Sequence, residues 1–527
     1  MGNRHSSPAA PVVEGDPIVM KGRPKILLIT PPYHAGVVES AGRWMPLSFV
    51  YLAGAARAGG YDAEIYDAMT KQHGLKDIEA RVKVSDADFV GVTAITSSLP
   101  ASLEVLRLAK RHRPEVRTIL GGVHPTFCYR EVLELHADIV DFVVCGEGER
   151  TLPALMKAVE EGTPPDDVRG IAFARDGNVI TTPPRRFVED LDALPTAWDA
   201  VTWEDYRYFV IPGSRLAAIS TSRGCTHGCT FCSQQRFWEK QWRARSPKSV
   251  VQEMTDLKRH YGANVFLIVD EYPTRDRARW EEFLDRLMRA HLDVYVLMET
   301  RVEDIVRDAD IMWKYRSAGI VHIYVGVEAT NQATLDLVKK DISVEQSKQA
   351  IDIIHAHRMI SETSFVLGFP WETSETIADT LALAQHYNPD FAHFLAITPW
   401  PYADIHAEMA DFIEERDYGK YNLVEPVIRP ARMTLEQVRR AMLDCYRQYY
   451  MRKAPEYFAI TDSFKREYLR RSMHLIMRNS FLSTLMAHTG RTGDFNDIHQ
   501  LLSQANTGTI GFQTGQKHAI DEEYFDR

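Results

Sequence analysis

Three cysteines lie within eight residues in the run Cys225-Thr-His-Gly-Cys229-Thr-Phe-Cys232, directly after the apolar stretch Leu216 to Ile219. The other cysteines stand singly: Cys128, Cys145 and Cys445. A structural zinc site has four closed ligands, usually as two separated pairs, whereas three thiolates hold an iron–sulfur cube with one iron left open. The spacing therefore predicts an iron–sulfur cluster at a strand end. The alternative is a zinc site completed by His227 or by a distant side chain, but His227 lies between two of the cysteines and would be strained if it shared their metal.

The length and charge of the chain limit its class. A length of 527 residues predicts two to four domains. The chain has 72 acidic and 62 basic residues, so it lacks the excess of positive charge that nonspecific nucleic-acid binding requires. The opening residues 1–22 lack the apolar core of a signal peptide. No apolar run approaches the roughly 20 residues that cross a bilayer. We therefore expect a cytoplasmic protein without a transmembrane segment.

From Lys25 onward, short apolar runs alternate with amphipathic helical stretches. Five runs are expected to be strands: 26–30, 63–67, 88–94, 117–122 and 141–146. Single helices between them predict a parallel, Rossmann-like α/β sheet, and such sheets bind ligands beyond the carboxyl ends of the strands.

Small and polar residues follow these expected strands, and the glycines among them let a ligand approach the backbone closely. Their alignment along one sheet edge favours a large planar ligand over plain turns. The residues singled out are Thr93, Gly121, Gly122, His124, Gly146, Glu147 and Gly148.

A second α/β region follows a proline-rich connection that is expected to contain one hairpin. Six strand candidates separated by helices predict a six-unit β/α partial barrel: 216–220, 264–270, 294–299, 322–327, 363–368 and 392–398. Barrel sites lie at the carboxyl ends of the strands, and the cysteines follow the first one. Polar residues at the other ends then become candidates for ligand contacts, among them Glu299, Arg301, Glu328 and Gly368.

The last region looks helical, and Thr434-Leu-Glu-Gln437 fits a capping box ahead of an apolar face. Its Tyr and Met residues are expected in the core, with a planar aromatic substrate as the alternative. The expected organisation is a flexible tail at 1–23, a cofactor-binding sheet domain at 24–165, a linker at 166–212, a barrel domain at 213–402 and a mainly helical domain at 403–527.

The cysteine spacing, with Phe231 before Cys232 at the head of a barrel, resembles the radical S-adenosylmethionine superfamily. The resemblance implies that Cys225, Cys229 and Cys232 hold a [4Fe-4S] cluster whose fourth iron binds S-adenosylmethionine. It further implies that Gly326 and Glu328 surround the methionine moiety, that Gly368 lies on the adenine side, and that Glu299 and Arg301 contact ribose or carboxylate.

The preceding sheet domain resembles the cobalamin-binding subgroup of this superfamily, which assigns the planar ligand as cobalamin. The corrinoid signature of that subgroup has a histidine two residues after an aspartate, whereas Asp67-Ala-Met69 has methionine there. We therefore expect cobalamin without histidine below the cobalt. We expect His124 to be a hydrogen-bonding or structural residue beside that site.

Further motifs resemble the anaerobic oxidative cyclase family that builds the fifth ring of bacteriochlorophyll from magnesium-protoporphyrin IX monomethyl ester with oxygen from water. They are Tyr33-His34, 41–44, 51–54, 67–70, 232–234, Phe237-Trp238, 398–401 and 449–453, whereas the stretch 35–43 departs from the family pattern. That departure leaves a cobalamin-dependent C-methyltransferase as the alternative. A non-catalytic iron–sulfur and corrinoid binding or sensing protein is the third possibility.

The cyclase resemblance implies a tetrapyrrole-like substrate and a protein reductant such as flavodoxin or ferredoxin. Acid–base residues among His34, His322 and His393 stay unassigned, because spacing does not show which of them converge. Arg466, Arg470 and Arg471 could meet a substrate propionate, although a solvated helix face explains them better.

Overall fold

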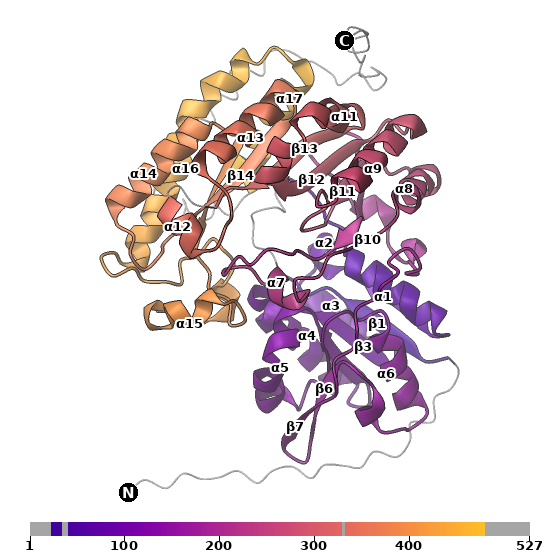
Figure 1. Ribbon diagram of the computed structural model, residues 1–527. Coiled ribbons are helices and arrows are strands. Elements are labelled where there is room, and N and C mark those ends of the chain that lie inside the picture. The colour runs from indigo at the N-terminus through magenta and orange to yellow at the C-terminus, as the bar shows by residue number, and fades with distance from the viewer. Residues whose placement is uncertain (1–22, 34–40, 329–331, 480–527) are drawn as a thin grey trace, which may run out of the picture.

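The computed structural model describes residues 23–33, 41–328 and 332–479, so His34 and the tail at 1–22 lie outside the described residues. Two α/β lobes follow one another along the chain, and Figure 1 shows the first in indigo and purple below the second in red and orange. None of the described helices is both long and apolar enough to cross a bilayer.

The first sheet has the strand order β2-β1-β3-β4-β5-β6-β7. Its first five strands are parallel, as expected, and the last two are antiparallel. Their bounds are β1 Lys25–Ile29, β2 Asp62–Tyr66, β3 Phe89–Thr93, β4 Arg117–Gly121, β5 Phe142–Val144, β6 Ile171–Arg175 and β7 Asn178–Thr181.

Helices cover both faces of this sheet, which confirms the Rossmann-like prediction. One apolar cluster packs three helices on one face, and a second cluster packs two helices on the other. The first set is α3 Leu75–Lys83, α4 Leu99–His112 and α5 Val123–His136, and the second is α1 Leu47–Ala58 and α6 Thr151–Glu160. The strand order reverses between β1 and β3, so the carboxyl edge there is where such a sheet binds its ligand.

The hairpin expected in the connection does form, and it extends the first sheet. Val143 of β5 pairs with Ala172 of β6. The segment after it is packed rather than loose, because Trp198, Tyr206 and Tyr208 are buried in the same apolar core as the barrel strands. The connection therefore joins the two lobes rigidly.

The second sheet is an open, six-stranded parallel sheet in the order β15-β14-β13-β12-β11-β8, which confirms the partial barrel. Its strands are β8 Leu216–Ile219, β11 Val265–Ile268, β12 Tyr295–Arg301, β13 Ile320–Gly326, β14 Ile360–Leu367 and β15 Phe391–Ala396. The helices between them are α8 Pro247–Tyr261, α9 Arg277–Ala290, α10 Val302–Arg307, α11 Met312–Ser317, α12 Gln332–Leu337, α13 Val344–Ala356 and α14 Ser374–Tyr387.

Successive residues of these strands differ in burial because side chains alternate between the two faces. Glu299, Glu362 and His393 are half-buried, whereas their neighbours Thr363 and Phe394 are fully buried. The half-buried residues therefore lie on the concave face of the barrel, where a ligand can reach them.

The helical C-terminal region contains the predicted capping box. Thr434 caps α16 Leu435–Ala459, with Gln437 N–H donating to Thr434 Oγ1 at 3.2 Å and Thr434 N–H donating to Gln437 Oε1 at 2.8 Å. The expected apolar face is buried at Val438, Met442, Cys445, Tyr446 and Tyr449, and α16 packs against β15. Core packing therefore explains these side chains.

Helix α17 Ser463–Asn479 closes the amino-terminal end of the barrel. Its Tyr468 is fully buried and shares hydrogen bonds with His322 Nδ1 at 2.7 Å and with the hydroxyl of Tyr208 at 2.5 Å. Phe464 stacks on Tyr295 with ring centroids 5.5 Å apart. One side chain thus ties the helix, the barrel and the connection together.

Tyr468→Phe is expected to lower the free energy of unfolding by about 1–3 kcal/mol, because it leaves two buried polar groups without their shared partner. Thermal unfolding of the purified protein measures the change. Tyr61→Phe is the matched control: it removes one hydroxyl bonded to Glu160 at 3.0 Å, and that carboxylate can turn to water. Equal loss in both variants would contradict a special role for Tyr468.

Candidate functional site

The cysteine loop leaves β8 and runs over the carboxyl ends of the barrel strands to the short helix α7 Gln234–Phe237, which Figure 1 shows between the lobes. Gly224, just before Cys225, has φ +99°, and a Cβ there would lie 2.0 Å from the carbonyl oxygen of Gln241. Only glycine fits this position. Cys229 is buried, and Cys225 and Cys232 are half-buried.

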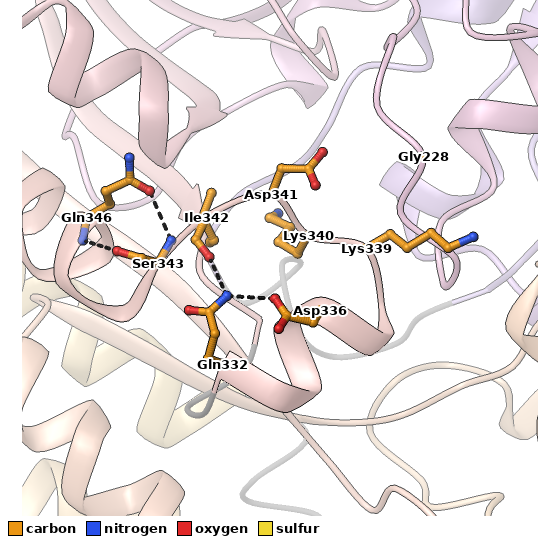
Figure 2. Close-up of a pocket in the computed structure, with 9 residues that line it drawn as sticks. All are labelled: Gly228, Gln332, Asp336, Lys339, Lys340, Asp341, Ile342, Ser343 and Gln346. Atoms are coloured by element: carbon orange, nitrogen blue, oxygen red, sulfur yellow. Dashed lines mark hydrogen bonds between the residues drawn. The ribbon is translucent and has the colours of Figure 1, made fainter.

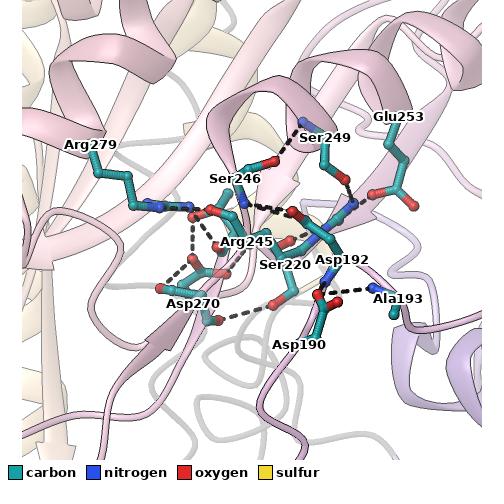
Figure 3. Close-up of polar contacts among 12 residues, drawn as sticks. Asp190, Asp192, Ala193, Ser220, Arg245, Ser246, Ser249, Glu253, Asp270 and Arg279 are labelled. Carbon is teal, nitrogen blue, oxygen red and sulfur yellow. Dashed lines mark hydrogen bonds and ion pairs between the residues drawn. The ribbon is translucent and has the colours of Figure 1, made fainter.

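A polar network fixes the foot of the loop. The buried Asp270 carboxylate accepts hydrogen bonds from the Thr221 backbone N–H at 2.7 Å, from the Thr221 hydroxyl at 2.5 Å and from the Ser222 hydroxyl at 2.8 Å. Arg279 donates to the Thr221 carbonyl at 2.6 Å, and Arg245 donates to the Ser220 carbonyl at 3.1 Å (Figure 3). The chain's own polar groups therefore hold the strand end that carries the cysteines.

The three thiols influence one another, and two cations lie close to them. Burial raises the pKa of Cys232 to about 12 and also raises that of Cys225, with further upward contributions from neighbouring thiols. Arg301 opposes this at Cys225, and Lys340 does so at Cys232. Thiolates at these positions would therefore need the positive charge of a bound metal group in addition to these two cations.

In the ranges that the structure describes, no three His, Cys, Asp or Glu side chains converge closely enough to share a metal ion as they stand. The three cysteines thus lie on one loop, and among the described residues they do not form a complete set of ligands for a single metal ion. His227 approaches Glu303 at 3.8 Å and Asp341 at 3.9 Å. These contacts engage the His227 ring with other side chains, and three thiols on one loop fit an iron–sulfur cluster with an open iron better than a closed zinc site.

Arg301 lies on β12 below the cysteine loop and is 7% exposed. Its Nε donates to Glu303 and its guanidinium lies 5.9 Å from the Tyr272 ring, yet its Nη2 has no hydrogen-bond partner among the described residues. A buried guanidinium nitrogen without a partner suits an anionic ligand group. This geometry supports the predicted carboxylate contact.

Gly326 and Glu328 meet at the end of β13. The Glu328 carboxylate accepts from Lys340 Nζ at 3.0 Å, and Glu328 has φ +61°. A Cβ on Gly326 would lie 2.5 Å from Glu328 Oε1 and 2.8 Å from Lys340 Nζ. The glycine therefore leaves room for a buried ion pair beside the cysteine loop, which sequence reasoning did not find.

The Gly368 turn is closed by a carboxylate. Gly368 has φ +88°, and Glu372 accepts hydrogen bonds from the N–H groups of Gly368 and Phe369. Burial raises the pKa of Glu372 to about 7. Phe231 of the cysteine loop packs against the apolar cluster that contains Phe369, so the loop and this turn share one surface.

A pocket of about 560 Å³ lies on the outer side of the cysteine loop, and Figure 2 shows it. Only Gly228 comes from the loop. Gln332 donates to Asp336 at 2.8 Å and to the Ile342 carbonyl at 3.3 Å, and Ser343 and Gln346 cap α13. Gln332, Asp336, Ser343 and Gln346 are thus engaged with one another or with the backbone, and we assign this pocket no ligand.

The carboxyl edge of the first sheet opens into a cavity of about 310 Å³. Six of the seven residues predicted there line it: Thr93, Gly121, Gly122, Gly146, Glu147 and Gly148. Gly122, at φ +104°, approaches Ala94 so closely that a Cβ would lie 2.5 Å from its carbonyl oxygen. Gly146 has open space beside it. A ligand can therefore lie against this backbone.

The same cavity is also lined from the barrel side, by Ser220, Ser222, Arg223, Phe237, Trp238, Val269 and Glu271. Both lobes thus form one site. The basic residue Arg223 was missed in the sequence, where its only signal is its place two residues before Cys225.

His124 does not line this cavity. Its ring is fully buried, its Nδ1 lies 3.1 Å from Thr96 Oγ1, and the Tyr418 ring is 5.0 Å away. Burial lowers its pKa to about 4, so the ring is neutral near pH 7. This environment supports the predicted structural role.

Asp67 is likewise structural. Its carboxylate accepts from the Thr30 hydroxyl at 2.8 Å, from the Tyr206 hydroxyl at 3.0 Å and from Thr70 N–H at 3.1 Å, which caps α2 Ala68–Lys71. Its oxygens are engaged in holding this turn of the first lobe.

Among the unassigned histidines, His322 and His393 converge on one carboxylate. Glu362 lies 2.7 Å from His322 Nε2 and 2.5 Å from His393 Nε2, and the two rings lower the pKa of Glu362 far below its usual range. This group lies on the concave face near α17.

The C-terminal arginines make local contacts: Arg470 and Arg471 pair with Glu467, and Arg466 donates to the Ile460 carbonyl.

Comparisons agree with this two-lobed site. A B12 binding domain model matches residues 33–156, and a radical SAM superfamily model matches residues 219–384. The solved structure of OxsB, a cobalamin-dependent S-adenosylmethionine radical enzyme with aqua-cobalamin bound, shares the fold, with a TM-score of 0.66 at 15% identity, covering 92% of this chain and 76% of that chain. The protein is a cobalamin-dependent radical S-adenosylmethionine enzyme. A [4Fe-4S] cluster, S-adenosylmethionine and cobalamin are its cofactors.

Relatives define the family more narrowly. The anaerobic magnesium-protoporphyrin IX monomethyl ester cyclase of Rubrivivax gelatinosus is 37% identical over 463 residues, which cover 87% of this chain and 83% of the relative. The enzyme of the same name from Cereibacter sphaeroides is 35% identical over 452 residues, covering 84% and 73%. The chain belongs to this cyclase family, which confirms the resemblance seen in the sequence.

Gly224→Ala is expected to reduce iron incorporation at least about 10-fold on anaerobic reconstitution, because the new methyl group has no room and displaces Cys225. Iron and sulfide analysis measures the loss. Gly228→Ala in the same loop is the control: its Cβ would meet nothing nearer than Lys240 Nζ at 3.5 Å. Equal iron content in the two variants would show that the strained backbone is unimportant.

Glu299→Gln tests the charge of the concave face. Burial raises the pKa of Glu299 to about 8, so the folded protein holds a proton that the unfolded chain releases near pH 4.3. Wild-type stability therefore falls as pH rises between these values. We expect the variant to gain in thermal stability over wild type as pH rises from about 6 to about 8, and the gain to level off above that. Glu345→Gln, on the exposed start of α13, should show no such trend.

Proposed function

We propose that this protein is the oxidative cyclase that forms the isocyclic fifth ring of bacteriochlorophyll from magnesium-protoporphyrin IX monomethyl ester with oxygen from water. The observation that carries the proposal is the shared cavity: the cobalamin edge and the foot of the cysteine loop line one site in a member of this cyclase family. A protein reductant such as flavodoxin or ferredoxin supplies electrons, and the cytoplasmic location stays a prediction.

When bound, the cluster and S-adenosylmethionine supply hydrogen-atom abstraction, and cobalamin supplies electron transfer. The chain's own residues position and shield these groups. Cys225, Cys229 and Cys232 hold the cluster, while Arg301, Glu299 and the Gly326–Glu328 turn receive the polar ends of S-adenosylmethionine.

The concave face of the barrel fits a substrate that carries both an apolar ring and polar side chains. Half-buried Leu267, Val366 and Leu395 alternate there with the polar groups of Glu299, Tyr324 and Glu362. Because α17 covers the amino-terminal end, the substrate enters from the cobalamin side, where the first lobe lies beside the opening and limits the water that reaches a radical.

The test is an anaerobic incubation of the reconstituted enzyme with magnesium-protoporphyrin IX monomethyl ester, S-adenosylmethionine, cobalamin and reductant in ¹⁸O-labelled water. Mass spectrometry should find a ring-closed product that carries one labelled oxygen. The Cys225→Ala variant, which lacks a cluster ligand, should form no product.

Two other results would replace the proposal. Transfer of a labelled methyl group from S-adenosylmethionine to the tetrapyrrole, without oxygen incorporation, would identify a C-methyltransferase. Absence of reductant-dependent 5′-deoxyadenosine with every substrate would favour a binding or sensing protein.

A further inference from the structure

The loop at 146–149, which the sequence suggested as a cofactor contact, also grips the cysteine loop. Glu147 is 5% exposed along its side chain and lies between two arginines. Its carboxylate accepts from Arg223 at 2.7 Å and from Arg243 through two contacts of 3.0 Å. Glu149 accepts from the second Arg223 nitrogen at 2.7 Å. These four residues are called the interlobe bridge below.

Aromatic rings fix the arginines of the interlobe bridge. The Arg223 guanidinium lies 5.1 Å from the Tyr51 ring, and the Arg243 guanidinium lies 4.7 Å from Phe187 and 5.3 Å from Trp238. Such contacts, together with paired carboxylate bonds, restrict the planar guanidinium to one orientation. The interlobe bridge is therefore a rigid link.

The interlobe bridge touches both cofactor regions at once. Arg223 lies opposite Arg243 in the short antiparallel ribbon formed by β9 Ser222–Arg223 and β10 Arg243–Ala244. Cys225 comes two residues after Arg223 in the chain. On the other side, Glu147, Glu149 and Arg223 all line the cavity of the first lobe. A ligand in that cavity lies against the same side chains that hold the start of the cysteine loop.

We propose that the interlobe bridge couples cobalamin binding to assembly of the cluster, with Glu147 as the positioning residue. A buried charge that loses its partner is strongly unfavourable, so displacement of the cysteine loop must disturb Glu147 and the cavity wall beside it. Binding linkage is reciprocal: if an ordered cluster loop favours cobalamin, bound cobalamin favours the ordered loop by the same factor. The proposal rests on the cofactor set, not on the tetrapyrrole substrate.

The experiment compares the affinity for hydroxocobalamin of cluster-loaded and cluster-free full-length protein, followed by absorbance. The cluster-loaded wild type should bind at least about 5-fold more tightly, the lower range of measured couplings. Glu147→Gln keeps the size of the side chain and removes its charge, so its two affinities should agree within about 2-fold. Glu149→Gln, which loses one of the ion pairs, should give an intermediate ratio.

Asp199→Asn is the matched control, because the Arg57–Asp199 ion pair at 2.8 Å joins α1 to the connection away from the cysteine loop. It should keep the wild-type ratio. A second readout needs no cofactor: hydrogen exchange of the apo protein over residues 221–232 should speed up in Glu147→Gln and stay unchanged in Asp199→Asn.

Equal affinities of the two wild-type forms would overturn the proposal, as would an unchanged ratio in Glu147→Gln. Loss of hydroxocobalamin binding in both forms of Glu147→Gln would make Glu147 a direct ligand contact instead. If Glu147→Gln does not fold, an unchanged ratio in Glu149→Gln decides against the coupling. None of these outcomes bears on ring closure, so failure here leaves the cyclase proposal to its own assay.

Discussion

A carboxylate held between two arginines joins the lobes, and the common site depends on that contact. Glu147 lies in the loop after β5, in the lobe that binds cobalamin, whereas Arg223 and Arg243 belong to the ribbon from which the cysteine loop begins. Each group is nearly inaccessible to water, so neither charge can be left alone. The two lobes are consequently held in a fixed arrangement. A radical that forms at the cysteine loop of the barrel would then lie close to the cobalamin edge of the first lobe.

Within the barrel, the cofactor edge is shaped by backbone positions that exclude a side chain. Gly224 lets the cysteine loop turn sharply against Gln241, and Gly326 leaves space for the Glu328–Lys340 pair. Asp270 then satisfies the donors at the foot of the loop. Most of the cysteine loop after β9 has no strand partner. Close backbone packing at the glycines and hydrogen bonds to buried polar groups therefore fix its conformation.

Much of this architecture could be predicted from the sequence. Short apolar runs, separated along the chain by helical stretches, indicated both parallel sheets, because a strand that is buried on both faces needs apolar residues throughout. The cysteine spacing located the cluster loop, and Thr434 with Gln437 located the start of α16. These are local signals, carried by residues close together in the chain.

Long-range pairings could not be predicted in this way. Glu147 looked like a ligand contact because glycines flank it, and nothing nearby revealed that Arg223 and Arg243 would reach it across about 76 and 96 residues of chain. The convergence of His322 and His393 on Glu362 was hidden for the same reason. Partners of buried charges are set by how sheets and lobes pack, not by spacing.

Helix α17 gives the barrel a floor beneath β12 and β13, through Tyr468 and Phe464. Among the described residues, the side of the barrel that faces the first lobe is the side where both lobes line a cavity. In the proposed ring closure, the planar substrate and the water that supplies its oxygen would both arrive from that side. The order in which they arrive would then decide whether the reaction can finish, and α17 contributes to this by covering the opposite end.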